Sequence, residues 1–396
     1  MFKTLDQMEC RGRRVIVRGD LNVPVRDGQV TDTTRLDRLV PTLKELSEKG
    51  ARVAVVSHFG RPKGQLVPEM SLRPIADALS ASLGGLPVTF VEDCVGERAR
   101  AAIDELSDGG LVLLENLRFH SGEEANDPEF AKALAANGDL YVNDGFSVSH
   151  RAHASTDGIT RHLPAYAGRG MQAELEALTA ALETPRKPVA ALVGGAKVSS
   201  KLAVLGHLLD KVDSLIIGGG MANTFLFALG TDVGTSLCES DLADTAREIM
   251  ARADETGCRI VLPSDVVIAG ALEEGIATET VPIAAVPPDR MILDVGPDSV
   301  AALNAHLGDC GTLLWNGPLG AFEVPPFNVG TNMVARRAAA LTKAGTLVSV
   351  AGGGDTVAAL AGADAIDGFT YVSTAGGAFL EWLEGRELPG VAALNN

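Results

Sequence analysis

The sequence has few cysteines, and their spacing matches no familiar disulfide or metal pattern. They are an odd set without a CxxC pair, at Cys10, Cys94, Cys238, Cys258 and Cys310. Disulfide frameworks and zinc sites usually need closely spaced or evenly paired cysteines. The pattern therefore favours reduced thiols, and we expect a cytoplasmic protein.

Long hydrophobic runs and an excess of basic residues are also missing. No uninterrupted apolar stretch approaches membrane-spanning length, and no apolar segment near the N-terminus indicates secretion. The 34 Lys and Arg residues face 51 Asp and Glu residues, giving a formal net charge of −17. This balance argues against nucleic-acid and membrane partners. It does not exclude small anionic substrates, which respond to local charge.

Several catalytic motifs are absent from the sequence. There is no GxSxG elbow, no HExxH and no recognisable general-base pair. The GxGxxG fingerprint of a dinucleotide-dependent oxidoreductase, with its acidic residue roughly 20 residues later, is also absent. Phosphoryl transfer between groups that are already ionised needs no base, only alignment and charge neutralisation.

What the chain has is a regular alternation of apolar runs and helical patterns. In the first half, strands are predicted at Val15–Val17, Val53–Ser57, Val88–Val91, Leu111–Leu114 and Leu140–Val142, with helices at Arg35–Lys49 and Ser71–Leu83. In the second half, strands are predicted at Val189–Val193, Ser214–Ile217, Ile260–Leu262, Met291–Asp294, Thr312–Trp315, Leu347–Val350 and Phe369–Val372. The pattern predicts an α/β protein with two doubly wound parallel sheets, in two domains joined by a long helix from about Met171.

The residues that follow the predicted strands differ between the two halves. Those in the first half are rich in cations and histidines: Arg18, His58, Arg61, Arg118, His120, His150, Arg151 and His153, with Arg35 close by. Each arginine alone could form an ordinary surface ion pair, but together they favour a small, highly charged acid. Those in the second half are mostly glycine, which favours a nucleotide.

The segment from Thr346 to Leu360 has the strongest ligand signal. An apolar strand leads into Gly352, Gly353 and Gly354, and Asp355 and Thr356 then open a helical pattern. Free N–H groups at such a turn bind phosphate, and Asp355 could hold Mg²⁺. The alternative is a tight turn in which Asp355 only caps the helix.

Two lysines follow a strand and a glycine pair in the segment VGGAKVSSK. A helix beginning near Ala196 would place Lys197 and Lys201 four residues apart on one face, within reach of the same phosphate chain. The segment is not a Walker A loop. The alternative is a pair of solvated lysines.

Nine segments in order and spacing resemble the phosphoglycerate kinase family. They are RGDLNVP, SHFGRPKG, ENLRFH, HRAHAST, GGAKVSSK, GGGMANTF, WNGPLGAFE, AGGGDT and STAGGAFLEWLEGRELPGVAAL. The resemblance implies a kinase of glycolysis that transfers the acyl phosphate of 1,3-bisphosphoglycerate to ADP, with Mg²⁺, giving 3-phosphoglycerate and ATP. It implies two Rossmann-like domains facing a cleft, with direct in-line transfer after hinge closure.

The resemblance also implies domain limits and site residues. Residues 1–168 with 378–396 would bind the triose acid, and 169–377 the nucleotide. The acid would be bound by Asp20, Leu21, Asn22, Arg35, His58, Phe59, Gly60, Arg61, Arg118 and Arg151. The nucleotide would be bound by Lys197, Lys201, Asn316, Glu323, Gly352, Gly353, Gly354, Asp355 and Thr356, with Asp355 as metal ligand. Arg35, Lys197 and Gly376 would be catalytic.

The sequence departs from the family pattern at several positions. They are Gly19, which we expect to loosen the strand end, Ser147 to Ser149, Asp157, Ser200 and Phe379. We expect a monomer. The alternative function is a two-domain anion- and nucleotide-binding module without chemistry.

Overall fold

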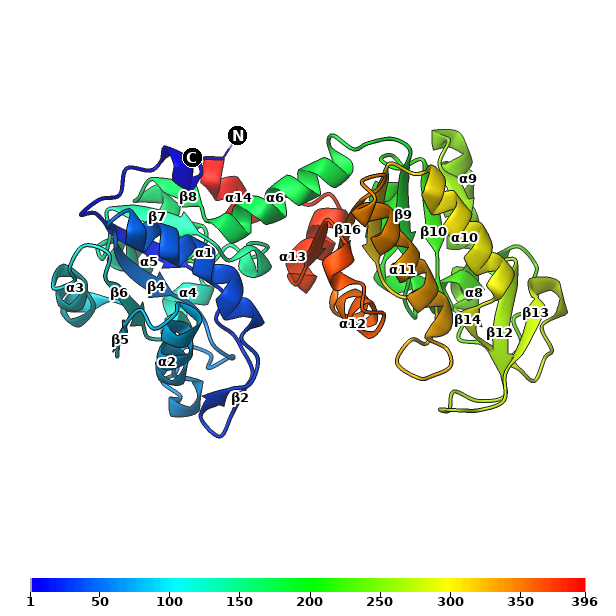
Figure 1. Ribbon diagram of the computed structural model, residues 1–396, viewed down its shortest axis with the longest axis horizontal. Coiled ribbons are helices and arrows are strands. Elements are labelled where there is room, and N and C mark those ends of the chain that lie inside the picture. The colour runs from blue at the N-terminus through cyan, green and yellow to red at the C-terminus, as the bar shows by residue number, and fades with distance from the viewer. Residues whose placement is uncertain (1, 396) are drawn as a thin grey trace. The chain divides into compact units, whose positions relative to one another are not determined.

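The computed structural model describes residues 2–395 and divides into two compact units. Unit 1 comprises the residues up to Leu175 together with those from Glu387 onward. Unit 2 is Glu176–Arg386. The boundary falls inside α6 (Arg169–Leu182), whose first residue is bound to unit 1 through ion pairs with Asp6 and Glu45 (Figure 1). The second boundary lies beyond α13 (Gly376–Leu383), which contacts α7 (Leu202–Leu208) in unit 2.

Unit 1 is built on a parallel sheet of six strands in the order β5-β6-β4-β1-β7-β8. The strands are β1 (Arg14–Arg18), β4 (Arg52–Val56), β5 (Val88–Val91), β6 (Leu111–Leu114), β7 (Leu140–Asn143) and β8 (Ala165–Ala167). The helices are α1 (Thr34–Glu48), α2 (Arg73–Ser82), α3 (Gly96–Asp104), α4 (Ser121–Glu124), α5 (Pro128–Ala135) and the C-terminal α14 (Pro389–Ala392). A small hairpin of β2 (Val25–Arg26) and β3 (Gln29–Val30) precedes α1.

From Val15 onward, successive residues of the central strand β1 are all buried, as a sheet covered on both faces requires. Val15 and Val17 pack in one core cluster with Leu39 and Leu43 of α1. Ile16, which points to the opposite face, is also fully buried. The near-continuous apolar strands of the sequence therefore form the parallel sheet that they predict.

Unit 2 has a second parallel sheet of six strands, in the order β11-β10-β9-β15-β16-β17. The strands are β9 (Val189–Val193), β10 (Ser214–Ile217), β11 (Arg259–Val261), β15 (Thr312–Asn316), β16 (Val348–Gly352) and β17 (Tyr371–Ser373). The helices besides α7 and α13 are α8 (Gly219–Ala228), α9 (Ala243–Thr256), α10 (Pro297–Asp309), α11 (Val329–Lys343) and α12 (Gly354–Gly362). The order reverses between β9 and β15, and ligands bind such sheets beyond the strand ends at this point.

One predicted strand of the parallel sheet belongs elsewhere. The run Met291–Asp294 forms β14 (Met291–Val295), which pairs antiparallel with β12 (Asp265–Ala269). With β13 (Glu279–Pro282) they make a separate sheet of three strands. The sequence interpretation missed β12 and β13. Periodicity reveals an apolar run but not the strand that pairs with it, so the run Met291–Asp294 was assigned to the wrong sheet.

Two glycines lie against each other at the point where the strand order of the unit 2 sheet reverses. A Cβ on Gly194, directly after β9, would overlap the carbonyl oxygen of Pro318, and a Cβ on Gly317, after β15, would overlap that of Gly194. The Trp315 indole donates to the Gly317 carbonyl at 2.7 Å. Absent side chains thus allow the two strand ends to approach.

Within the described part of the chain, none of the helices combines the length and apolar character that crossing a bilayer requires.

We predict that Gly194→Ala destabilises unit 2 by about 1–3 kcal/mol, the usual cost of overpacking, because backbone atoms must move. Urea unfolding followed by tryptophan fluorescence measures this, since both tryptophans, Trp315 and Trp382, lie in unit 2. The control is Gly362→Ala, where a Cβ in α12 would meet nothing within 4 Å. An unchanged midpoint for Gly194→Ala would contradict the close approach.

Candidate functional site

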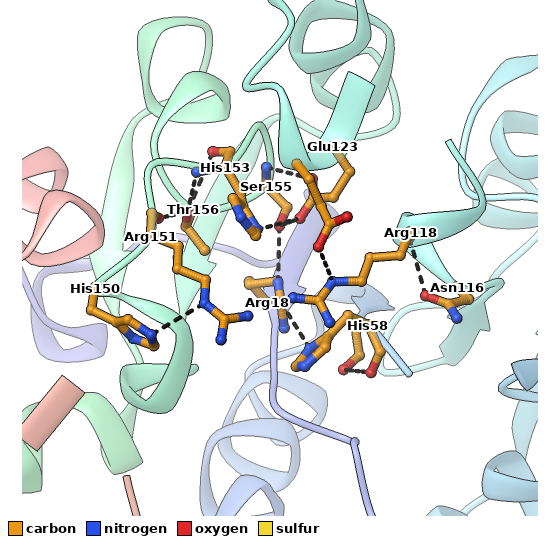
Figure 2. Close-up of polar contacts among 12 residues, drawn as sticks. Arg18, His58, Asn116, Arg118, Glu123, His150, Arg151, His153, Ser155 and Thr156 are labelled. Atoms are coloured by element: carbon orange, nitrogen blue, oxygen red, sulfur yellow. Dashed lines mark hydrogen bonds and ion pairs between the residues drawn. The ribbon is translucent and has the colours of Figure 1, made fainter. Parts of the chain in front are cut away.

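Four strands of unit 1 deliver cations and imidazoles to one edge of the sheet. Arg18 ends β1, His58 follows β4, Arg118 follows β6 and Arg151 follows β7. Figure 2 shows these side chains pointing toward one another. These four of the residues that the sequence suggested therefore lie together, whereas His120 pairs with Asp93 at 3.0 Å.

Arg18 is the most deeply placed of these cations, with 1% of its surface exposed. Its guanidinium donates to Ser155 Oγ at 2.9 Å and to the Gly19 carbonyl, and it faces His58 Nδ1 at 3.2 Å. A buried guanidinium needs such partners, because an unpaired buried charge is costly.

His58 is a neutral imidazole in this setting. Burial lowers its pKa well below the usual range, and the positive charges of Arg18, Arg118 and Arg151 lower it further. Burial and the same arginines lower the pKa of His153 to about 4. The edge is therefore positive through its arginines and not through its histidines.

Two other arginines of the edge have different partners, and Arg118 is also buried. Arg118 forms an ion pair with Glu124 at 3.1 Å and donates to the Gly60 carbonyl at 2.8 Å. Arg151 Nε donates to His150 at 3.1 Å. Among the described residues, exposed Arg61 has no hydrogen-bond or ion-pair partner.

Arg35 reaches the same edge from α1. It donates to Asp20 Oδ2 at 2.9 Å and to the Asn22 carbonyl at 3.0 Å. Ser147, one of the unusual residues, donates to the same carboxylate oxygen at 2.5 Å. Asp20 thus orients the catalytic candidate Arg35.

Three backbone amides of the expected acid site already have partners inside the site. Leu21 N–H donates to Ser57 Oγ at 2.9 Å, and Phe59 N–H donates to Asn116 Oδ1 at 3.1 Å. Gly60 N–H donates to Asn22 Oδ1 at 2.9 Å. These amides are therefore bonded within the protein, and the positive charge of the edge comes from the side chains.

The carboxyl edge of the unit 2 sheet holds a cavity of about 720 Å³. Its lining is mostly apolar or glycine and includes exposed Leu237 and Leu272, together with Glu323 and Asp355. This volume is in the range of small-ligand sites.

The glycine turn has the predicted strand–turn–helix form, with one difference. Gly353, at φ +101°, precedes α12, so Asp355 is the second helical residue and not its cap. A Cβ on Gly353 would lie 2.7 Å from Asn316 Nδ2, whereas one on Gly354 would meet nothing within 4 Å. Thr356 is buried, and its hydroxyl accepts from Gly317 N–H at 2.7 Å.

The expectation of one helix carrying both lysines is wrong. Val198–Ser200 is a short 3-10 turn and α7 begins only at Leu202, so Lys197 and Lys201 each precede a separate element. The glycine pair and Ser200, whose hydroxyl donates to the Lys197 carbonyl at 2.8 Å, favour a turn over a helix. Lys197 is exposed, whereas Lys201 bonds to Asn316 Oδ1.

The remaining nucleotide candidates are held in different ways. Asn316 is buried and donates to the Gly352 carbonyl at 2.7 Å, which ties β15 to the glycine turn. Gly376 begins α13, and a Cβ there would meet nothing within 4 Å. Glu323 is exposed.

Two of the unusual residues lie at closely packed positions. A Cβ on Gly19 would lie 2.6 Å from Leu39 Cδ2, so this glycine packs the strand end closely against α1 and does not loosen it. The buried ring of Phe379 lies against Gly352, where a Cβ would be 2.6 Å away.

A group of metal-binding residue types lies outside the predicted sites. Within the described residues, Asp93, Cys94 and His120 bring possible ligand atoms within 4.8 Å of one another. His120 Nε2 and Asp93 Oδ1 are already 3.0 Å apart, and Cys94 is fully buried. Mg²⁺ prefers oxygen ligands, so this group does not suit it.

The sequence interpretation missed several groups that shape the two edges. Glu123, Ser155 and Asn116 are buried polar residues close to the arginines, and Asp294 lines the cavity of unit 2. Burial raises the pKa of Asp294 to about 7, while bonds from Gly330 and Val295 N–H lower it. The sequence placed Asp294 at the end of a predicted strand, but nothing in it marked the burial of Glu123.

Comparison with known proteins identifies the family. The family model "Phosphoglycerate kinase" matches residues 5–386. The chain belongs to the phosphoglycerate kinase family. The phosphoglycerate kinase of Rhizobium meliloti (strain 1021) is 62% identical over 394 residues, covering 99% of this chain and 98% of the relative. That of Ruegeria sp. (strain TM1040) is 60% identical over 393 residues, covering 99% of each chain.

Solved structures of phosphoglycerate kinases have the same fold. The enzyme from Coxiella burnetii has a TM-score of 0.92 at 41% identity, covering 100% of this chain and 99% of that one. The enzyme from Pyrococcus horikoshii OT3 has a TM-score of 0.82 at 31% identity, covering 100% of this chain and 98% of that one. The two-sheet architecture is therefore that of phosphoglycerate kinases.

We predict that ADP affinity falls as the pH rises through 8. Burial lowers the pKa of Lys201 to about 8, with the Asp355 carboxylate acting in the opposite direction. The ammonium is therefore present below this pH and lost above it. Isothermal titration calorimetry between about pH 7 and 9.5 measures the effect, and Lys201→Arg, which stays charged, should remove it. A pH-independent wild-type affinity would contradict the prediction.

Proposed function

We propose that the chain catalyses the reversible transfer of the acyl phosphate of 1,3-bisphosphoglycerate to ADP, giving 3-phosphoglycerate and ATP. It would thus act as a phosphotransferase with a carboxyl group as acceptor, in glycolysis. The observation that carries the proposal is the cluster of Arg18, Arg118 and Arg151 around neutral His58 at one sheet edge. A small acid with both a carboxylate and a phosphate suits this density of guanidinium groups.

In the proposed acid site the side chains have distinct tasks. Arg61, Arg118 and Arg151 supply charge, and His58 supplies a neutral N–H. Asp20 and Asn22 orient Arg35, which would lie at the acid's reacting end. Exposed Arg61 has no protein partner among the described residues, which leaves its guanidinium available to an anion.

The proposed nucleotide site uses backbone and space more than charge. The apolar cavity beside Leu237 and Leu272 suits a base, and Glu323 at its lining suits a ribose hydroxyl. The turn Gly352–Thr356 offers N–H groups at the start of α12 for phosphates. Lys197 and Lys201 would neutralise phosphate charge, and Asn316 would hold Lys201 in place.

The residues beside the turn fit a Mg²⁺ ion that accompanies the nucleotide. The Asp355 carboxylate is exposed, and the space beside Gly354 is open. Mg²⁺ is usually held by one or two carboxylates together with substrate phosphates and water. Asp355 would be its protein ligand, and the ion would neutralise phosphate charge.

The proposed chemistry needs no general base. The carboxylate and the nucleotide phosphate are already ionised, so transfer requires in-line alignment and stabilisation of the moving phosphoryl group. Arg35 from unit 1, and Lys197 and the Gly376 N–H from unit 2, would supply that stabilisation. Because the acid and the nucleotide belong to different units, transfer requires the two units to approach and water to be excluded.

The setting proposed for this activity is a monomer in the cytoplasm without nucleic-acid or membrane partners. The net charge of −17 supports the absence of polyanionic partners. The alternative of a binding module without chemistry does not account for two lysines and an acidic residue beside the glycine turn, apart from the arginines.

The test of this function is ATP-dependent phosphorylation of 3-phosphoglycerate by the purified chain, coupled to consumption of the acyl phosphate, with and without Mg²⁺. Turnover that requires the acid, the nucleotide and Mg²⁺ together supports the proposal. Binding of the acid without turnover would instead favour the binding module.

We predict that Asp355→Ala mainly damages Mg²⁺ use. The variant should need a higher Mg²⁺ concentration for half-maximal rate, while KM for 3-phosphoglycerate stays near the wild-type value. Asp367→Ala removes another exposed carboxylate of unit 2 and serves as the control. An unchanged Mg²⁺ dependence in Asp355→Ala would refute the metal role.

We predict that Arg35→Ala and Lys197→Ala each lower kcat far more than they weaken ground-state binding. Loss of a cation at a migrating phosphoryl group costs on the order of 10³-fold. Steady-state kinetics with both substrates measures the effect, and Arg98→Ala, at a 70% exposed side chain on α3, is the control. A variant with nearly full kcat would remove that residue from the mechanism.

A further inference from the structure

A line of four hydrogen-bonded side chains, which we call the relay, passes through Arg18 between Arg118 and Arg151 (Figure 2). It runs from Glu123 through Ser155 and Arg18 to His58, with distances of 2.6, 2.9 and 3.2 Å. The residues come from α4, the loop after β7, β1 and the loop after β4. All four are buried, with exposed fractions of 0%, 0%, 1% and 5%.

The direction of each hydrogen bond in this line is fixed by chemistry. A guanidinium only donates, so His58 Nδ1 must accept from Arg18, and the imidazole proton must lie on Nε2. Ser155 Oγ accepts from Arg18, so its own hydrogen goes to Glu123 Oε1. The Ser155 N–H donates to Glu123 Oε2 at 3.0 Å, so both oxygens accept, as those of a carboxylate do.

We propose that Glu123 is a positioning residue for the acid site. It orients the Ser155 hydroxyl, which fixes the Arg18 guanidinium, which in turn holds His58 in the tautomer that carries its proton on Nε2. Identifying the bound acid as 3-phosphoglycerate rests on the proposed function, but the tautomer of His58 does not.

The electrostatics of the edge explain why such a relay is useful. A doubly protonated His58 would face Arg18 and lie close to Arg118, Arg151 and Arg35, so the charged form is disfavoured. The opposite neutral tautomer would direct an N–H at the Arg18 guanidinium. The relay leaves one form, which offers a hydrogen bond to an anion without adding positive charge.

Other groups contact the relay without extending it. His153 Nδ1 lies 3.8 Å from Glu123 Oε1, beyond a normal hydrogen bond. Tyr141 donates its hydroxyl to the Ser155 carbonyl at 2.7 Å, not to the Ser155 hydroxyl. This second contact provides a matched control, because it is buried, involves the same residue and lies outside the relay.

The experiment combines imidazole ¹⁵N NMR with kinetics. The wild type should show His58 with Nδ1 unprotonated and Nε2 protonated, assigned by the loss of its signals in His58→Gln. In Ser155→Ala, Arg18 loses an acceptor, and the His58 signals should move toward a mixture of tautomers. KM for 3-phosphoglycerate should rise about tenfold, the loss expected for a hydrogen bond to a charged group, with kcat and KM for ATP nearly unchanged.

Two further variants separate positioning from folding. Glu123→Gln keeps the shape of the side chain and removes its charge, and it should also disturb the His58 signals. Tyr141→Phe should lower the melting temperature without changing the tautomer or KM. Native His58 signals in folded Ser155→Ala and Glu123→Gln would overturn the proposal, as would equal KM changes in Ser155→Ala and Tyr141→Phe.

The spectra need no turnover, so the two proposals can fail separately. An inactive protein whose variants lose the native His58 signals would refute the proposed function and support the relay. An active protein whose variants keep those signals would do the reverse.

Discussion

Mutual repulsion among buried and half-buried arginines is the constraint that shapes unit 1. Arg18, Arg118 and Arg151 meet at one sheet edge, where low solvent access strengthens their repulsion. The structure compensates with carboxylates placed beneath and beside them, Glu123 and Glu124. It also keeps the nearby imidazoles neutral, since burial and the arginines lower the pKa values of His58 and His153. The two carboxylates balance part of the positive charge of the arginines, and the side of the cluster away from them stays positive.

In unit 2 the ends of the central strands approach closely because glycines follow them. Its two central strands end in glycines so close that a Cβ on Gly194 or Gly317 would overlap backbone. The cavity next to them is lined largely by apolar residues and glycine, and half-buried Lys201 close by has a pKa lowered to about 8 by desolvation. An anion at this edge would therefore meet N–H groups and few fixed charges, whereas one at the edge of unit 1 would meet guanidiniums.

The sequence predicted the parts of the fold that local pattern determines. Buried parallel strands are apolar almost throughout, so Val15–Val17 and Val189–Val193 were readable as strands. Pairing is a long-range property, and Met291–Asp294 was wrongly assigned to the parallel sheet because its partner, β12, lies more than 20 residues earlier. The ordered segments identified the family, but they could not show that a 3-10 turn separates Lys197 from Lys201.

The buried polar residues were the hardest to predict, and the reason is physical. Glu123 lies in the segment SGEE, where it is indistinguishable from the exposed Glu124 beside it. Only the fold reveals that one carboxylate faces Ser155 and the other faces solvent and Arg118. A buried carboxylate is unfavourable unless its hydrogen bonds are satisfied, and both Glu123 oxygens are satisfied by Ser155. Its position beneath Arg18 is therefore better explained by the electrostatics of the cation cluster than by packing alone.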